Sequence, residues 1–164
     1  VQEAKEKFKN LKSLYTDLEL HLTGPLQTNK VKLALEIFDV FQTLDREKLA
    51  LEFVKHIETS VNKKFFIQIN TGLEETKSGI YPNFADEFIQ YCVNDLNLPI
   101  IGLMCIPPLD EKPEKHFLIL KKLAEDNNLK HLSMGMSNDY KEAILCGATY
   151  VRIGTKIFGK RNEN

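Results

Sequence analysis

The sequence predicts an α/β fold, a (β/α)8 TIM barrel of which this chain holds the last six units. Segments with helical periodicity alternate strictly with short segments rich in β-branched and aromatic residues along the 164-residue chain. Such alternation is typical of a parallel sheet covered by helices. One βα unit takes about 25–30 residues. No Gly-x-Gly-x-x-Gly follows a predicted strand, so the alternative, an open doubly wound sheet, lacks its dinucleotide-binding fingerprint.

Six strands are predicted, each short, largely apolar and bounded by turn residues or by the start of a helix. They cover residues 19–23, 40–44, 65–70, 100–106, 131–134 and 149–153. An eight-stranded barrel needs two more, and the chain opens in a helical segment. We therefore expect the first two βα units of the barrel to be missing from this chain, and residues 1–164 to form one partial domain.

Apolar residues between the strands recur at the spacing of amphipathic helices. Predicted helices cover residues 1–15, 28–38, 83–95, 111–127 and 138–146. A further helix follows Asp45, its expected cap, with an apolar side made by Leu49, Ala50, Phe53, Val54 and Ile57. Ser137 is expected to cap the last helix and Gly147 to end it, and the polar segment 71–82 is predicted to be a loop.

Composition excludes several classes of protein. Apolar residues make up 43% and charged residues 27%, which is enough for a globular core. The 22 basic and 23 acidic residues give a net charge of −1, which argues against nucleic acid as the main partner. No segment has the ~20 apolar residues of a membrane span, and the first residues carry no secretory signal. We therefore expect a cytoplasmic protein that binds no membrane.

The three cysteines, Cys92, Cys105 and Cys146, lie far apart in apolar segments. An odd number without a C-x-x-C pair does not suit a disulfide framework or a zinc knuckle. They are predicted to be small buried hydrophobic residues in a reducing compartment. The histidines show no metal-ligand spacing, and no G-x-S-x-G or Cys–His pattern indicates a nucleophile, so we expect neither a metal site nor a catalytic residue.

Two clusters follow the last two strands, at the end where barrels bind their ligands. They are residues 133–137 and 152–155. Gly135 and Gly154 would let backbone N–H groups approach an anion, and Ser137, as a helix cap, would favour negative charge. Taken singly, the serine is only a cap and the glycines only make turns. Together, on neighbouring strands, the clusters favour a phosphate site.

Arg152 and His21 each leave two interpretations open. Arg152 lies one residue inside the end of its strand, and a buried arginine needs an acceptor. That acceptor is either a cofactor heteroatom or the carboxylate of a structural ion pair. His21 either lines the barrel mouth or is a structural histidine whose hydrogen bonds are satisfied.

These strand ends, together with several other stretches, resemble the pyridoxal phosphate homeostasis proteins, single-domain relatives of the alanine racemase N-terminal barrel. The matching stretches occur in the same order along almost the whole chain. They are residues 1–4, 21–30, 68–70, 77–79, 102–104, 132–137, 151–155 and 157–159.

The resemblance implies a fold-type III barrel that binds pyridoxal 5′-phosphate (PLP) at its mouth. It implies that Ser137, Gly154 and Thr155 hold the phosphate and that Arg152 faces the pyridine nitrogen. It further implies that Met136 approaches the cofactor through its backbone, and that His21 and Asn70 lie near the mouth.

One departure from the family concerns the lysine that forms a Schiff base with the cofactor on the first barrel strand. No lysine of this chain matches that position. We expect the chain to contain the phosphate side of the site without its covalent anchor, to bind PLP weakly, and to associate through its unpaired strand edges. The full-length protein is expected to be a monomer.

The resemblance favours a PLP-binding protein of intracellular PLP homeostasis without catalytic turnover, serving PLP-dependent client enzymes. A second hypothesis is a PLP-dependent amino-acid racemase, which needs an acid–base pair on both sides of the α-carbon. No second base is evident in the sequence. A third is a barrel enzyme that uses the same phosphate site for a phosphorylated metabolite.

Overall fold

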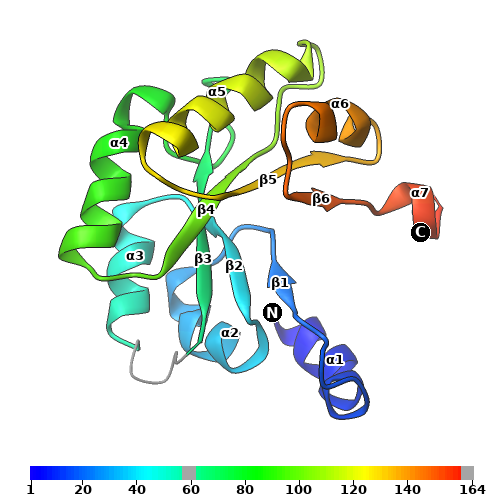
Figure 1. Cartoon of the computed structure of the whole chain (residues 1–164). Helices are drawn as coiled ribbons and strands as arrows, with labels where there is room; N and C mark the ends of the chain where they lie inside the picture. The colour runs from blue at the N-terminus through cyan, green and yellow to red at the C-terminus, as the bar shows by residue number, and fades with distance from the viewer. Residues whose placement is uncertain (57–61, 160–164) are drawn as a thin grey trace.

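The computed structural model describes residues 1–56 and 62–159, and within them it forms one parallel sheet of six strands (Figure 1). The strands are β1 (His21–Leu22), β2 (Val40–Leu44), β3 (Lys64–Ile69), β4 (Ile100–Cys105), β5 (His131–Met136) and β6 (Tyr150–Arg152). All six lie where the sequence predicts them. Their order in the sheet is their order in the sequence. In a doubly wound sheet the strand order reverses at one point, and the sheet of the described residues has no such reversal.

The helices follow the strands in alternation. They are α1 (Gln2–Leu14), α2 (Val31–Ile37) after the 3₁₀ turn η1 (Thr28–Lys30), α3 (Glu47–Val54), α4 (Pro82–Gln90) continued by the π-helical turn η3 (Tyr91–Asp95), α5 (Pro113–Asp126), α6 (Tyr140–Leu145) and α7 (Thr155–Phe158). Right-handed crossovers between strands in sequential order place the connecting helices on one face of the sheet. Figure 1 shows α2 to α6 on this outer face.

The sheet is strongly curled, which contacts across its inner face demonstrate. In a flat sheet, β2 and β5 would lie about 14 Å apart, three strand spacings. Yet the Gln42 side chain of β2 lies 2.5 Å from the Ser133 hydroxyl of β5. The rings of His21 on β1 and Tyr150 on β6 have centroids 5.7 Å apart. The architecture is therefore a curled parallel half-barrel, compatible with the predicted barrel.

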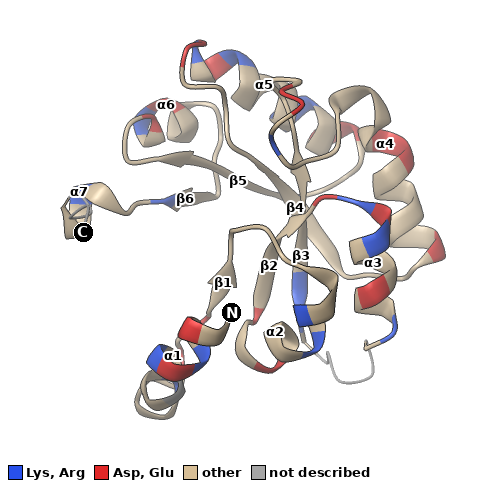
Figure 2. Ribbon diagram, turned by 180° about the vertical axis from the view of Figure 1, so that it is seen from behind, with Lys and Arg blue, Asp and Glu red and all other residues tan. Residues whose placement is uncertain are grey.

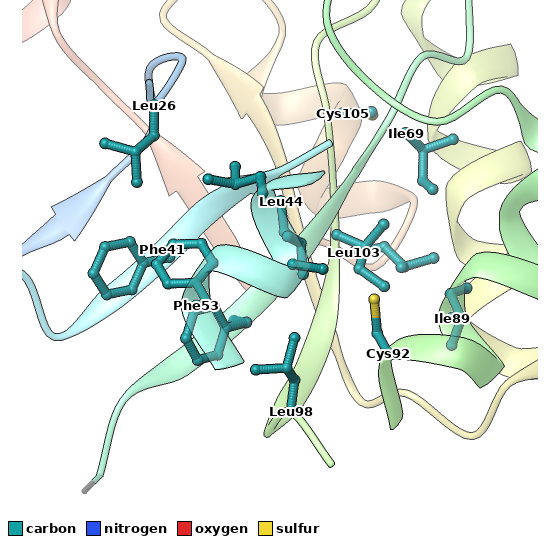
Figure 3. Packing of buried hydrophobic residues seen from close by; sticks show 14 of the residues in the cluster. Leu26, Phe41, Leu44, Phe53, Ile69, Ile89, Cys92, Leu98, Leu103 and Cys105 are labelled. Atoms are coloured by element: carbon teal, nitrogen blue, oxygen red, sulfur yellow. The ribbon is translucent and has the colours of Figure 1, made fainter. Parts of the chain in front are cut away.

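The main core fills the space between the outer face of the sheet and the helices (Figure 3). At one end of it, the rings of Phe41, Phe53 and Phe65 pack against one another with centroid distances of 4.8–5.4 Å. A second, smaller cluster lies on the inner face and contains Val40, Phe66 and Met104. Charged residues lie mainly on helices and loops, and β4 and β5 contain none (Figure 2).

The cysteine prediction is supported by burial. Cys92 and Cys105 are buried free thiols, and Cys146 is a partly buried free thiol. Burial raises the pKa of the Cys92 and Cys105 thiols to about 12, so both stay protonated at neutral pH. None of the helices in the described residues is long and apolar enough to cross a bilayer.

Two local predictions differ from the structure. Asp45 does not cap α3, because the helix starts at Glu47 after Arg46 and the Asp45 carboxylate instead accepts from the Arg46 guanidinium. The helix predicted over 83–95 ends in a π turn, in which the Leu96 N–H donates to the Tyr91 carbonyl five residues earlier. Ile57, expected on α3, lies outside the described residues.

The aromatic cluster yields a stability prediction. Phe41→Ala is expected to lower the free energy of unfolding by about 3–5 kcal/mol, because Phe41 is fully buried and its ring packs against three others. Urea denaturation measures this change. The same substitution at Phe84, whose side chain is 56% exposed, is expected to change it by less than about 0.5 kcal/mol. Equal losses at the two positions would contradict this placement of the core.

Candidate functional site: the cavity at the ends of β5 and β6

An open cavity of about 790 Å³ lies beyond the carboxyl ends of β5 and β6. Its walls come from the loop after β4, from the turns after β5 and β6, and from Thr23 after β1. Five residues predicted for the site line it: Met136, Ser137, Arg152, Gly154 and Thr155. The fold thus joins the two strand-end clusters, because parallel strands end at the same edge of a sheet.

Ser137 faces the turn between β6 and α7. Its Oγ accepts the backbone N–H groups of Gly154 at 3.3 Å and of Lys156 at 3.4 Å. The prediction that Ser137 caps the next helix is wrong, because α6 begins only at Tyr140 and has Asp139 at its cap position. Asp139 Oδ1 accepts the Met136 N–H at 2.6 Å, so the Asp139 carboxylate holds the turn between β5 and α6. The Ser137 hydroxyl is directed instead towards Gly154 and Lys156.

The two glycines have different roles. Gly135 has a φ of +89°, and an added Cβ would lie 2.5 Å from the Cβ of Ala143 on α6. Gly135 is therefore required for the turn and for close packing of α6, which corrects its predicted role in anion approach. At Gly154 an added Cβ would meet nothing within 4 Å, so this backbone segment is open towards the cavity.

Arg152 is partly buried, and its guanidinium is held by two uncharged acceptors. Nη1 donates to Ser133 Oγ at 2.8 Å, and Nη2 donates to the Cys105 carbonyl at 2.9 Å. It forms no ion pair within the described part of the chain, so the structural ion pair left open by the sequence is not formed there. Burial lowers the pKa of the Arg152 guanidinium, which nevertheless stays protonated at neutral pH.

Asn70 lies outside the cavity and organises the loop after β3. Its amide nitrogen donates to the carbonyls of Glu74 and Lys77 at 2.8 and 3.1 Å, and its amide oxygen accepts the Glu74 N–H at 3.2 Å. The side chain is buried, and these three bonds occupy most of its hydrogen-bonding capacity. The structure therefore gives Asn70 a role in loop conformation.

His21 also lies outside the cavity but is connected to it. Its Nδ1 lies 2.8 Å from Gln42 Nε2, and Gln42 Oε1 contacts the Ser133 hydroxyl that Arg152 also contacts. Gln42 was not among the predicted site residues, and Ser133 was predicted only as the first residue of the cluster 133–137. The available signal was a polar residue inside an otherwise apolar buried strand, which needs a partner.

The groups gathered at the cavity suit an anion with several oxygen acceptors. The Ser137 hydroxyl and the N–H groups of Gly154 and Lys156 converge, and Ser137 Oγ already occupies an acceptor position between those N–H groups. The Arg152 cation lies in the same wall. Backbone N–H groups combined with a nearby cation are typical of phosphate sites. Among the described residues, no group of three or more His, Cys, Asp or Glu side chains could hold a metal ion.

A family profile and a curated relative both match nearly the whole chain. The profile of the alanine racemase N-terminal domain family matches residues 1–162. The pyridoxal phosphate homeostasis protein of Aquifex aeolicus is 42% identical to this chain, over 98% of this chain and 74% of the relative. The chain thus spans about three quarters of that relative's length.

Solved structures of the same family also resemble this chain. PipY of Synechococcus elongatus, solved without PLP, is 32% identical and superimposes with a TM-score of 0.86 over 96% of this chain and 78% of its own. PipY with PLP bound has a TM-score of 0.79 over the same shares of the two chains. Alanine racemase of Acinetobacter baumannii, 16% identical over 95% of this chain and 47% of its own, shares the fold with a TM-score of 0.72.

The resemblance identified from the sequence is therefore confirmed. The chain belongs to the alanine racemase N-terminal domain family, and within it to the group of pyridoxal phosphate homeostasis proteins.

Proposed function

We propose that this protein binds PLP in the cavity at the ends of β5 and β6 and takes part in intracellular PLP homeostasis without turning over a substrate. The observation that carries the proposal is the convergence of the Gly154 and Lys156 N–H groups on Ser137 Oγ, beside an arginine without a carboxylate partner among the described residues. The relatives' name and the PipY structure with PLP bound support it. When bound, PLP supplies an aldehyde and an electron-accepting ring.

The phosphate is assigned to Ser137, Gly154 and Thr155, and the pyridine nitrogen to Arg152. An arginine donates to an unprotonated ring nitrogen and disfavours its protonation, which weakens the ring as an electron sink. Asp139 engages both the N–H and the carbonyl of Met136. We therefore assign contact with the cofactor to the Met136 side chain, which is 37% exposed, in place of its backbone.

His21 and Asn70 are assigned indirect roles at the site. His21 acts through Gln42, and Asn70 through the loop that it holds. No lysine here matches the position that the family resemblance gives to the covalent anchor. We therefore expect these 164 residues to bind PLP non-covalently.

We further propose that residues 1–164 are a partial domain of an eight-stranded barrel. Strands in sequential order and the contact of His21 with Tyr150 across the interior support barrel curvature. β1 and β6 are the two edge strands of the sheet formed by the described residues, and parallel strands from two further βα units would pair with them. A quarter of the Aquifex aeolicus relative lies outside the matched region.

Two observations support the proposed absence of turnover: the name of the relatives, and the hydrogen bonds of the two cavity carboxylates, Asp139 and Glu111. Asp139 is engaged by the Met136 N–H. Glu111 is hydrogen-bonded by Lys115 at 3.0 Å, which holds the pKa of its carboxyl below the usual range. A carboxylate with a lowered pKa is a poor general base. The alternatives are a PLP-dependent racemase and an enzyme acting on a phosphorylated metabolite; alanine racemase is related to this chain in fold.

Binding of PLP to the purified protein, measured by equilibrium dialysis, tests the site. Ser137→Ala is expected to weaken binding about tenfold, because it removes a hydroxyl that bonds a charged group. Ser13→Ala removes an exposed hydroxyl on α1 and is expected to leave affinity unchanged. Equal affinities for wild type and Ser137→Ala would refute the phosphate assignment. Absence of any PLP binding would favour the phosphorylated-metabolite alternative.

Turnover is tested by incubating the protein with PLP and L-alanine and measuring D-alanine by chiral chromatography. The expected rate equals that of PLP alone, because Lys115 holds the pKa of the Glu111 carboxyl below its usual range and makes it a poor general base. Racemisation above that rate, abolished by Arg152→Ala, would instead establish the racemase alternative.

A further inference from the structure

A continuous chain of hydrogen bonds crosses the inner face of the curled sheet from Arg152 to Glu19. Arg152 Nη1 lies 2.8 Å from Ser133 Oγ, and Ser133 Oγ lies 2.5 Å from Gln42 Oε1. Gln42 Nε2 lies 2.8 Å from His21 Nδ1, and His21 Nε2 lies 2.9 Å from Glu19 Oε1. The chain thus connects β6, β5, β2 and β1 with the residues just before β1.

Chemistry fixes the direction of every bond in this chain. A guanidinium only donates, and so does the amide nitrogen of Gln42. Arg152 therefore donates to Ser133, whose single hydroxyl hydrogen must go to the amide oxygen of Gln42. Gln42 donates to His21 Nδ1, which leaves the hydrogen on Nε2 for the Glu19 carboxylate. The donors all run one way, from a cation to an anion, and such chains strengthen each bond.

The middle of the chain is sealed from solvent. Gln42 is 2% exposed and Ser133 is fully buried. The register of β2 against β3 shifts between Phe41 and Leu44, the segment that contains Gln42, and such irregularities redirect side chains. Glu19 at the far end is anchored by Lys64 at 2.7 Å, whose hydrogen bond lowers the pKa of the Glu19 carboxyl.

We propose that Gln42 and Ser133 are positioning residues that hold the Arg152 guanidinium towards the ring nitrogen of bound PLP. The inference rests on the proposed function, since it takes Arg152 as the partner of that nitrogen. Of the five N–H donors of an arginine, Ser133 and the Cys105 carbonyl take two, which leaves three for a ligand. Without Ser133 and Gln42 the guanidinium would have to be ordered at the moment of binding, at a cost in conformational entropy.

The test compares PLP with 1-deazapyridoxal 5′-phosphate, which has a carbon in place of the ring nitrogen. Gln42→Met keeps the length of the side chain and removes both of its hydrogen bonds in the chain. It is expected to weaken PLP about tenfold and the deaza analogue by less than about twofold. General damage to the cavity would weaken both ligands alike, so an equal loss for both, or no loss for either, overturns the proposal.

Thr43→Val is the matched control. Thr43 neighbours Gln42 on the same buried strand, and its hydroxyl has no hydrogen-bond partner among the described residues. The isosteric change is expected to leave the affinities for both ligands as in wild type. A selective loss of PLP affinity in Thr43→Val would show that any disturbance of β2 suffices, and it would overturn the proposal.

A second measurement needs no ligand and separates this inference from the proposed function. Nitrogen NMR of isotope-labelled protein follows rotation of the Arg152 guanidinium, with Arg152→Lys to assign its signals. Rotation is expected to be slow in wild type and Thr43→Val, and about tenfold faster in Gln42→Met and Ser133→Ala. Unchanged rotation in both variants overturns the inference. Failure of wild type to bind PLP, with the rotation changed as expected, refutes the proposed function and leaves Gln42 and Ser133 as the groups that position Arg152.

Discussion

The curl of the sheet decides how its inner face is filled. Strands in sequential order with right-handed crossovers place their helices on one face, so the other face must be filled by the strands' own side chains. The sheet achieves this by curving until residues from distant strands touch, as His21 and Tyr150 do. An extended sheet would leave Gln42 and Ser133 buried without partners or exposed to water, and each unpaired buried group costs about 1–3 kcal/mol.

The order of the strands in the sheet assembles the candidate site. Ser137 and Gly154 are brought together because β5 and β6 are neighbours that end at one edge. The approach of β4 to β5 requires Gly102, where an added Cβ would lie 2.1 Å from the His131 carbonyl oxygen. That close approach pairs Met104 with Ser133 in register. The missing side chain of Gly102 on β4 therefore helps to set the position of the buried Ser133 hydroxyl on β5.

Much of the fold could be predicted from the sequence, because the strands and helices are indicated by local periodicity and by the turn residues that flank them. The strand-end clusters were equally visible, since their residues are contiguous. The residue at the cap position of α6 could not be predicted, because Ser137 and Asp139 are both common capping residues. Tertiary contacts of Ser137 with Gly154 and Lys156 direct its hydroxyl away from α6. The Gln42–Ser133 bond joins residues 91 positions apart, and no local pattern carries such a pairing.

Arg152 links the proposed ligand site to the stability of the fold. A partly buried cation with two uncharged acceptors, and without an ion pair in the described part of the chain, retains part of its desolvation cost; burial lowers its pKa for the same reason. The polarised chain to Glu19 offsets some of that cost by aligning successive dipoles with the charge. In the proposed complex, a ligand acceptor facing the three remaining N–H groups would recover more of that cost. Under this proposal, PLP bound at Arg152 would also stabilise the folded state by mass action.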